Sequence, residues 1–416
     1  MSYVKIFYAY VLFCFGAFSY VFSQDKCNSE LLLDGSEQLV FADIDTTGNW
    51  WAITQPFSHR YSVIIQGIKH SDYDSVKQVI FSPDGLHYAY FAYKTGQWNI
   101  IVDDTILSLQ ANLPGIISFN RRGYMFYSIF QGENEILFIE QENGEFFHVA
   151  MYNRMGQIFV SNDCKHYAYQ AKRGVSQSIV IDNIESDRYI NIVPCGFMLD
   201  NSFVYAAEIG EQWRLMRSEQ ELFIASAIYE LHINQAQTII GCIKRVGNTY
   251  NAIMISDEFR EPYYSPPYDM ISNITLHPEA ALIGFKSIKN NNPRIVLNSS
   301  EYESGNQSGN PAFTHDGSAF FFAGDNNQDQ FMSVNGQKYI QKNGLNTNKI
   351  YALAPGSSTF AFTTSSALIM QNIHNSFSYA GIMVDTTSKP IYNYKTKRYE
   401  AIGVIRNRLY LMYCYP

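Results

Sequence analysis

Asp325, Asn327 and Asp329 lie at alternate positions of one short polar segment, Asp325-Asn326-Asn327-Gln328-Asp329. Side chains with this spacing can turn several oxygen atoms towards one point, which is how a calcium-binding loop gathers its ligands. The segment lacks the following glycine and the distal glutamate of such loops, and Asp and Asn are also favoured in solvated hairpin turns. A Ca²⁺ site and a plain turn are therefore the two interpretations of this segment, and no other cofactor is indicated.

A second segment, residues 258–269, combines aromatic side chains with proline. Tyr263, Tyr264 and Tyr268 stand among three prolines, and Arg260 lies just before them. Rigid aromatic side chains on an exposed loop can stack on sugars or anchor a protein partner. The alternative is that these tyrosines pack onto strands of their own repeat. The sequence predicts a binding surface at these four residues, with the packing alternative left open.

The chain contains none of the sequence motifs that mark common catalytic sites. It has no Gly-x-Ser-x-Gly elbow, no His-Glu-x-x-His, no phosphate-binding loop and no Cys-x-x-Cys. We therefore predict no catalytic residues and favour a protein that is not an enzyme. The alternative is a carbohydrate-active enzyme, a glycosidase or a lyase with acidic residues at the centre of the fold, because scattered Asp residues cannot be assembled into a site from sequence alone.

Charge and composition narrow the classes of partner. The 416 residues carry a formal net charge of -8 and no run of Lys or Arg, which excludes the clustered basic stripe of a nucleic-acid-binding surface. Hydrophobic residues make up 46% and charged residues 16% of the chain, as is typical of a well-packed globular protein. Proteins, glycans and other cell-envelope components are the partners we expect.

The beginning of the chain has the pattern of a secretory signal. Lys5 precedes a nearly uncharged apolar stretch, Ile6 to Phe22, and Ser23 stands before Gln24. An uncleaved anchor is the alternative, although about seventeen residues are marginally short to span a bilayer. We expect a signal peptide at 1–23, a mature chain without a transmembrane segment, and export to the periplasm or the extracellular space. Export permits disulfides.

One pattern recurs ten times between Ile44 and Cys414: an apolar strand, a tight turn, an aromatic-rich strand, a polar hairpin and a third apolar strand. The turns lie about 39 residues apart, which leaves room for one four-stranded blade per repeat, and helical periodicity is absent. The pattern predicts an all-β fold, a β-propeller of about ten four-stranded blades in residues 24–416. Fewer blades with accessory hairpins, or two smaller propellers, are the alternatives. The expected turn positions are Gly48, Gly85, Gly123, Cys164, Asn201, Ala236, Glu279, Gly317, Gly356 and Thr396.

The clearest copy of the repeat runs from Val79 to Gly85, continues through His87 to Tyr93 and ends at Val102-Asp103. In these residues the chain resembles the TolB-like propeller repeat, a WD-like repeat of exported bacterial proteins. Thr314 to Gly317 and Ser161 to Cys164 are weaker copies. The resemblance implies a ring of about six to eight blades, whereas this chain has ten repeats.

The last repeat supplies only three strands before the chain ends, so its outer edge needs a cover. The only unassigned strand-like segment is Glu30 to Asp34, and we predict that it completes the last blade and closes the ring. Antiparallel pairing with Leu409 to Tyr413 brings Cys27 near Cys414, and an exported chain would oxidise the pair. Such a disulfide contributes about 4 to 5 kcal/mol in the loop-entropy model. Two free thiols at frayed ends are the alternative.

Because propeller blades support unrelated functions, the fold leaves the activity undecided. The function we expect is that of an exported, non-catalytic propeller, which binds a protein or a cell-envelope component through one face of the ring.

Overall fold

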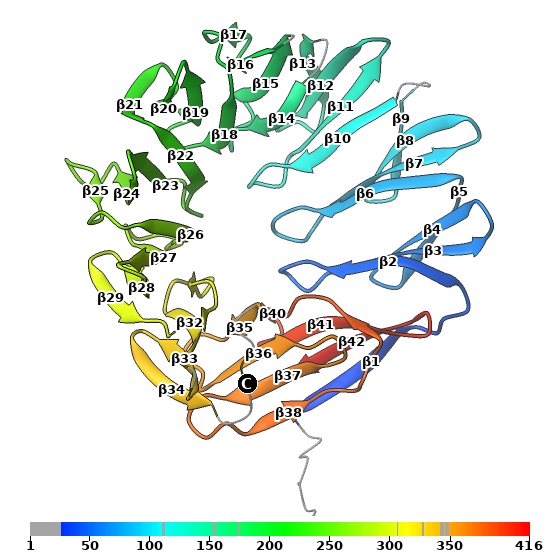
Figure 1. Cartoon of the computed structure of the whole chain (residues 1–416). Helices are drawn as coiled ribbons and strands as arrows, with labels where there is room; N and C mark the ends of the chain where they lie inside the picture. The colour runs from blue at the N-terminus through cyan, green and yellow to red at the C-terminus, as the bar shows by residue number, and fades with distance from the viewer. Residues whose placement is uncertain are drawn as a thin grey trace, which may run out of the picture.

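The computed structural model describes residues 26–109, 113–152, 155–173, 175–305, 307–326, 328–341, 345 and 349–416. These residues form ten antiparallel sheets arranged in a ring, with the first strand of each sheet nearest the axis (Figure 1). The chain is a ten-bladed β-propeller, as its repeats predict, and the alternatives with fewer blades or two rings are wrong. The expected signal peptide lies outside the described residues, among which no helix long and apolar enough to cross a membrane occurs.

The strands group into blades, which are numbered in chain order. Blade 1 contains β2 (Gln38–Ile44), β3 (Trp50–Phe57), β4 (Arg60–Ile65) and β5 (Ile68–Tyr73). Blade 2 contains β6 (Ser75–Phe81), β7 (Tyr88–Lys94), β8 (Gln97–Val102) and β9 (Thr105–Ser108). Blade 3 contains β10 (Leu113–Phe119), β11 (Met125–Gln131), β12 (Asn134–Glu140) and β13 (Phe146–Tyr152). Blade 4 contains β14 (Met155–Val160), β15 (Tyr167–Arg173), β16 (Ser176–Ile181) and β17 (Ile184–Glu185). Blade 5 contains β18 (Ile192–Phe197), β19 (Phe203–Ile209), β20 (Gln212–Arg217) and β21 (Gln220–Ala225). Blade 6 contains β22 (Ala227–Ile233), β23 (Ile239–Val246), β24 (Thr249–Ser256) and β25 (Tyr263–Tyr264).

In blades 8 and 10 the first strand is divided into two short pieces. Blade 7 contains β26 (Met270–Leu276), β27 (Ile283–Lys289), β28 (Asn292–Leu297) and β29 (Ser300–Glu303), and blade 8 contains β30 (Gln307–Ser308), β31 (Ala312–Phe313), β32 (Phe320–Asp325), β33 (Gln330–Val334) and β34 (Gln337–Gln341). Blade 9 contains β35 (Tyr351–Leu353), β36 (Thr359–Thr363), β37 (Leu368–Asn372) and β38 (Ser378–Ala380). Blade 10 contains β39 (Thr386–Thr387), β40 (Ile391–Asn393), β41 (Arg398–Ile405), β42 (Arg408–Cys414) and β1 (Cys27–Leu33).

In every blade except blade 1 the second strand is the most buried, because neighbouring blades cover both of its faces. In β7, Ala89, Tyr90, Phe91 and Ala92 are all fully buried, so the strand reads as a continuous apolar run instead of an alternating one. Glycine admits the closest approach between blades: a Cβ on Gly284 of β27 would lie 2.4 Å from the Phe320 ring of the next blade.

The first strands of blades 1 to 7 carry bulges, and the bulge of blade 6 links that blade to the next. In blade 6 the pairing shifts between Tyr229 and His232, and the Glu230 carboxylate accepts hydrogen bonds from the Asn273 and Ile274 amides of blade 7, at 3.0 and 2.8 Å. A bulge turns a side chain away from the regular alternation of a strand. The innermost strands are therefore joined by side chains that the alternating pattern does not predict.

In every blade except blade 7, the turn that follows the first strand holds a residue in the left-handed backbone region. Gly85 has a φ of 70° and Gly123 a φ of 89°, a conformation that glycine adopts without steric cost. In blades 6 and 10 the left-handed residues are Gln237 and Lys397. The expected positions, Ala236 and Thr396, are therefore wrong by one residue, because without glycine the sequence does not mark which residue of the turn takes the positive φ.

The ring closes by a strand from the opposite end of the chain. β1 pairs antiparallel with β42, with Glu30 opposite Leu411 and Leu31 opposite Tyr410. The same register sets Cys27 opposite Cys414, and the two form a disulfide with a sequence separation of 387. The predicted closure by the N-terminal segment and the predicted disulfide are both confirmed.

The disulfide should make a large contribution to the free energy of unfolding, because it joins nearly the two ends of the unfolded chain. We predict that Cys27→Ser/Cys414→Ser unfolds at a lower urea concentration than the wild-type chain, with a loss of up to about 5 kcal/mol. Urea unfolding followed by tryptophan fluorescence measures the loss. Dithiothreitol should lower the wild-type midpoint and leave that of the variant unchanged; equal midpoints for oxidised wild type and variant would contradict the prediction.

Candidate functional site

The turns after the first strands share a construction that holds their tips in place. In blade 3 the Asn120 side-chain oxygen accepts hydrogen bonds from the Arg122 and Tyr124 amides, both at 3.0 Å, while its nitrogen donates to the Ser161 carbonyl of blade 4 at 2.9 Å. Asn234 of blade 6 bonds the amides of its own turn in the same way. The first residue of the turn thus fixes the backbone, and the second residue is presented at the tip.

Residues from the tips of several turns meet across the ring, and we call this set of contacts the collar. Its contacts join blades that are not neighbours in the ring. They are Arg121 Nη2 to the Asn234 carbonyl (3.2 Å), Asn162 Nδ2 to Gln237 Oε1 (2.5 Å), Gln235 Nε2 to His315 Nε2 (3.4 Å), the His315 and Tyr394 rings (5.1 Å between centroids) and Lys395 Nζ to the Asp84 carbonyl (3.4 Å). The turns therefore converge on one end of the ring, the turn face.

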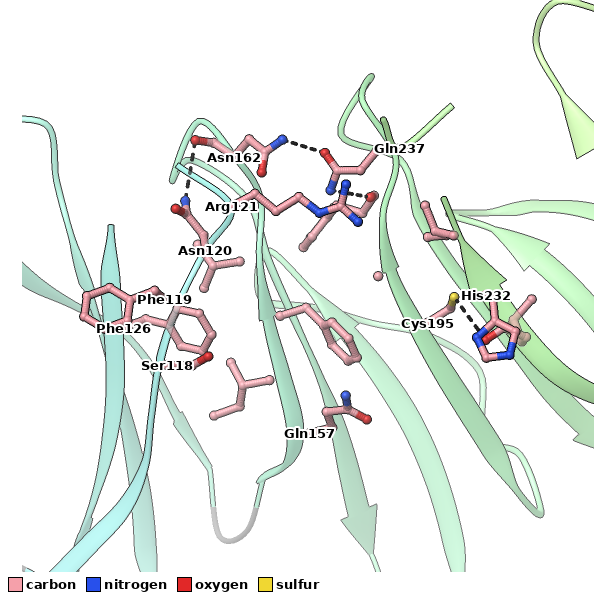
Figure 2. Close-up of a pocket in the computed structure, with 17 residues that line it drawn as sticks. Ser118, Phe119, Asn120, Arg121, Phe126, Gln157, Asn162, Cys195, His232 and Gln237 are labelled. Atoms are coloured by element: carbon pink, nitrogen blue, oxygen red, sulfur yellow. Dashed lines mark hydrogen bonds between the residues drawn. The ribbon is translucent and has the colours of Figure 1, made fainter. Parts of the chain in front are cut away.

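Two pockets that share no lining residue lie beside the collar. Pocket A, of about 440 Å³, is formed by the first strands of blades 3 to 6, β10, β14, β18 and β22, with turn residues at its mouth. Figure 2 shows Arg121 and the Asn162–Gln237 hydrogen bond at one end of the pocket and Gln157 and His232 on its walls. Phe119, Phe126 and Phe159 give the rest of the wall an apolar character.

Arg121 is the one lysine or arginine among the residues that line pocket A, and no Asp or Glu lines it. Its side chain stays accessible to solvent within the pocket, yet the surrounding walls remove part of its water and so lower the pKa of its guanidinium. An arginine remains charged under such a shift. Pocket A therefore places a positive charge among neutral groups.

Cys195 also lines pocket A, and it is unsuited to nucleophilic chemistry. Its Sγ donates a hydrogen bond to the Leu231 carbonyl, and burial raises the pKa of the thiol to about 12. Because the thiolate is the nucleophilic form, this thiol is nearly all protonated at neutral pH.

Pocket B, of about 540 Å³, lies among blades 8, 9, 10, 1 and 2 and has a cluster of aromatic rings in its lining. The rings are Phe313, Phe321, Tyr351, Tyr392 and Tyr394, and His315 and Lys395 line the pocket as well. Tyr392 and Tyr394 meet edge to face at 5.0 Å between centroids, and burial raises the pKa of both hydroxyls. The pocket thus offers aromatic faces together with neutral hydroxyl groups.

A buried carboxylate holds the blade 10 turn that supplies Tyr394. Glu400, 1% exposed, accepts hydrogen bonds from Arg398 Nε at 2.6 Å, Asn393 Nδ2 at 2.9 Å and Thr396 Oγ1 at 2.9 Å. Buried charges of this kind need complete pairing to be tolerated. The position of Tyr394 is therefore set from beneath by the core of blade 10.

The tyrosines of the segment 258–269 have divided roles. Tyr268 is 1% exposed and its hydroxyl donates to Glu301 at 2.7 Å, and Tyr263 donates to the Asn298 carbonyl. Both pack against the next blade, and a buried Tyr268 leaves no surface for a partner. Tyr264, 49% exposed, and Arg260 face solvent, and Tyr263 is partly exposed, so for these three the binding surface stays a prediction.

The predicted calcium ligands lie in the hairpin between β32 and β33. Asp325 Oδ2 accepts a hydrogen bond from Gln330 Nε2 at 3.0 Å, Asp329 is exposed, and Asn327 lies outside the described residues. No group of three or more His, Cys, Asp or Glu that could hold a metal ion occurs in the described part of the chain. The asparagine ligands of the proposed loop are not covered by that finding, so the Ca²⁺ site stays a prediction.

His87 and His166 belong to one network that two blades repeat. His87 Nδ1 lies 2.6 Å from Asp103 Oδ2, and its amide donates to Ser82 Oγ at 2.9 Å; His166 has the same contacts with Asp182 and Ser161, at 2.7 and 3.0 Å. The network ties the turn to the end of the third strand. Its repetition indicates a structural use of these histidines.

Sequence reasoning missed Arg121 and Tyr394, although a signal was present. Each follows an asparagine that begins a turn at the expected repeat position. Comparing the second turn residue of all ten repeats would have separated the blades that carry Arg, His or Tyr there from those that carry Pro.

Comparisons with known proteins found no relative by sequence and several distant likenesses among solved structures. No protein-family profile matches the sequence, and no curated protein is significantly similar to it. Similar solved structures include a eukaryotic initiation factor (8% identity, TM-score 0.45, covering 85% of this chain and 95% of that one) and oligogalacturonate lyase in complex with manganese (12%, 0.40, 91% and 97%). TolB from Acinetobacter baumannii is another (10%, 0.28, 72% and 75%). At such identities these likenesses say nothing about activity.

We predict that the His87–Asp103 contact makes the free energy of unfolding depend on pH. The hydrogen bond to Asp103 raises the pKa of His87, so the stabilisation is fully present below the unfolded pKa of about 6.5 and is lost as pH rises through the folded value. The side chains are 51% and 39% exposed, which limits the effect to below about 1 kcal/mol. Urea unfolding of wild type and His87→Gln should differ more at pH 5.5 than at pH 8.5. A difference that grows with pH would contradict this.

Proposed function

We propose that the protein is an exported, non-catalytic propeller that binds a glycan of the cell envelope at its turn face. The aromatic lining of pocket B carries this proposal: Tyr351, Tyr392 and Tyr394 offer ring faces and hydroxyl groups in one concave site. Sugar rings have apolar C–H faces and polar rims, and a mainly apolar pocket with a few placed polar groups is the usual form of a small-ligand site.

The disulfide supports export, and the location of the pocket supports binding at the turn face. The Cys27–Cys414 disulfide is of the kind that persists in oxidising compartments such as the periplasm or the cell exterior. The aromatic rings of pocket B come from the turn tips, the first strands and, for Phe321, the second strand of blade 8, which the packed blades hold rigid. A rigid site loses less conformational entropy on binding.

A protein partner is the second candidate, favoured by a groove at the other end of the first strands of blades 5 to 7. This groove, of about 710 Å³, is lined by Val193, Tyr229 and Met270 among others, and these three are 42 to 50% exposed. A contiguous exposed apolar surface of this kind is typical of protein interfaces.

Binding of neutral oligosaccharides tests the glycan proposal. We predict that the full chain binds a tetrasaccharide, either cellotetraose or chitotetraose, and that Tyr394→Ala weakens the affinity roughly five- to tenfold, which corresponds to a lost stacking contact of about 1 to 1.4 kcal/mol. Calorimetric titration measures the affinity, and circular dichroism checks that the variant is folded.

A control variant and an assay for reaction products separate pocket B binding from a rim site and from catalysis. Tyr264→Ala removes a solvent-facing tyrosine of blade 6 that lies outside both pockets, in the rim surface that is the rival location. If the glycan binds in pocket B, this variant should bind like wild type; loss of binding in Tyr264→Ala alone would move the site to the rim. Chromatography of the titrated sugar tests for catalysis. Shortened or unsaturated products would reverse the proposal in favour of a glycosidase or a lyase.

A further inference from the structure

Each pocket is lined by one cationic side chain, Arg121 in pocket A and Lys395 in pocket B. Arg121 donates to the Asn234 carbonyl at 3.2 Å, which leaves four of the five guanidinium N–H donors without a partner among the described residues. No carboxylate lines the pocket, although the chain as a whole has a net charge of -8. A guanidinium that has no carboxylate beside it in a partly enclosed site favours the binding of an anion from outside the chain.

Neutral polar groups are placed around the same space. Ser118 lies on β10, Gln157 in the bulge of β14 and His232 directly after the bulge of β22, and all three line the pocket. Their side chains form no hydrogen bond with any other described residue, so each remains available to a ligand. Figure 2 shows Gln157 and His232 on different strands around the pocket.

The position of Arg121 is fixed by its turn. Asn120, 5% exposed, bonds the Arg122 and Tyr124 amides and reaches the Ser161 carbonyl of blade 4. Arg122, the next residue, is also exposed but does not line the pocket. One turn thus presents two arginines in different surroundings, only one of which faces the site.

We infer that pocket A binds the oxyanion of a sugar-sized ligand, a carboxylate or a phosphate, with Arg121 as the charged contact. A guanidinium presents a planar fork of donors that matches either group. The pocket volume of about 440 Å³ falls within the usual range for small-ligand sites. The inference does not rest on the glycan proposal, since the two pockets share no lining residue.

Three probes with one sugar scaffold test the inference: glucuronate, glucose 6-phosphate and glucose, each titrated into the full chain to about 10 mM, ten times a Kd of about 1 mM. We expect at least one anion to bind and glucose to bind at least tenfold more weakly. Whichever anion binds more tightly identifies the oxyanion. If neither anion binds, or if glucose binds equally well, the inference is overturned.

Variants then assign the charge to its residue. Arg121→Gln keeps a donor for the Asn234 carbonyl and should weaken the anion at least tenfold, which corresponds to the loss of a charge-assisted hydrogen bond. Arg122→Gln removes the same charge from the same turn and should bind like wild type. Equal losses of anion affinity in both variants would mean that only the net charge matters, and would overturn the assignment.

Two further variants guard against misfolding and against confusion with pocket B. Arg121→Lys keeps the charge without the fork and should bind with intermediate affinity; if it binds no better than Arg121→Gln while both melt like wild type, the charge is not what the site uses and the inference fails. Tyr394→Ala should leave the anion affinity unchanged, so a failure of the glycan proposal and a failure of this one can be told apart.

Discussion

The antiparallel pairing of β1 with β42 is the constraint on which the rest of the molecule depends. Each blade lends its faces to its two neighbours, so a ring of ten is complete only when the last blade meets the first. The last blade takes its outer strand from the beginning of the chain and is fixed there by Cys27–Cys414. Contacts such as Lys395 of blade 10 with the Asp84 carbonyl of blade 2 exist only in the closed ring.

Within that closed ring, one turn construction produces two pockets of different chemistry. The first residue of a turn bonds the turn's own amides and so fixes the tip, while the second residue projects from it. In blade 3 that second residue is Arg121, and in blade 10 it is Tyr394. A repeat that keeps the holding residue can therefore vary the projecting one without changing the fold, which is how a propeller carries a site specific to one chain.

Much of the fold could be predicted from the sequence because its signals are local and repeated. The ten turns, the buried second strands and the incomplete last repeat each follow from a short run of residues, and the incomplete repeat was enough to predict the pairing of Cys27 with Cys414. The bulges of the first strands could not be predicted, because the residues that form them, such as Glu230, are not distinctive. Their purpose appears only in the contact with the next blade.

The candidate sites were harder to predict, since composition does not reveal burial or contacts across the ring. Tyr263, Tyr264 and Tyr268 look alike in sequence, yet Tyr268 is buried against Glu301 and Tyr264 is half exposed. Arg121 and Asn234 are 113 residues apart in the chain and meet only because the turns of blades 3 and 6 converge. Pocket A is therefore a property of the closed ring and not of any one repeat.

Ligand binding at the turn face, where the tips converge, is tested most directly by a crystal structure of the protein soaked with an oligosaccharide that ends in a uronic acid. We expect sugar rings against Tyr392 or Tyr394 in pocket B, or a carboxylate on the Arg121 guanidinium in pocket A. Density for the ligand only in the groove of Val193, Tyr229 and Met270, or only on Tyr264 at the rim, would contradict binding at the turn face.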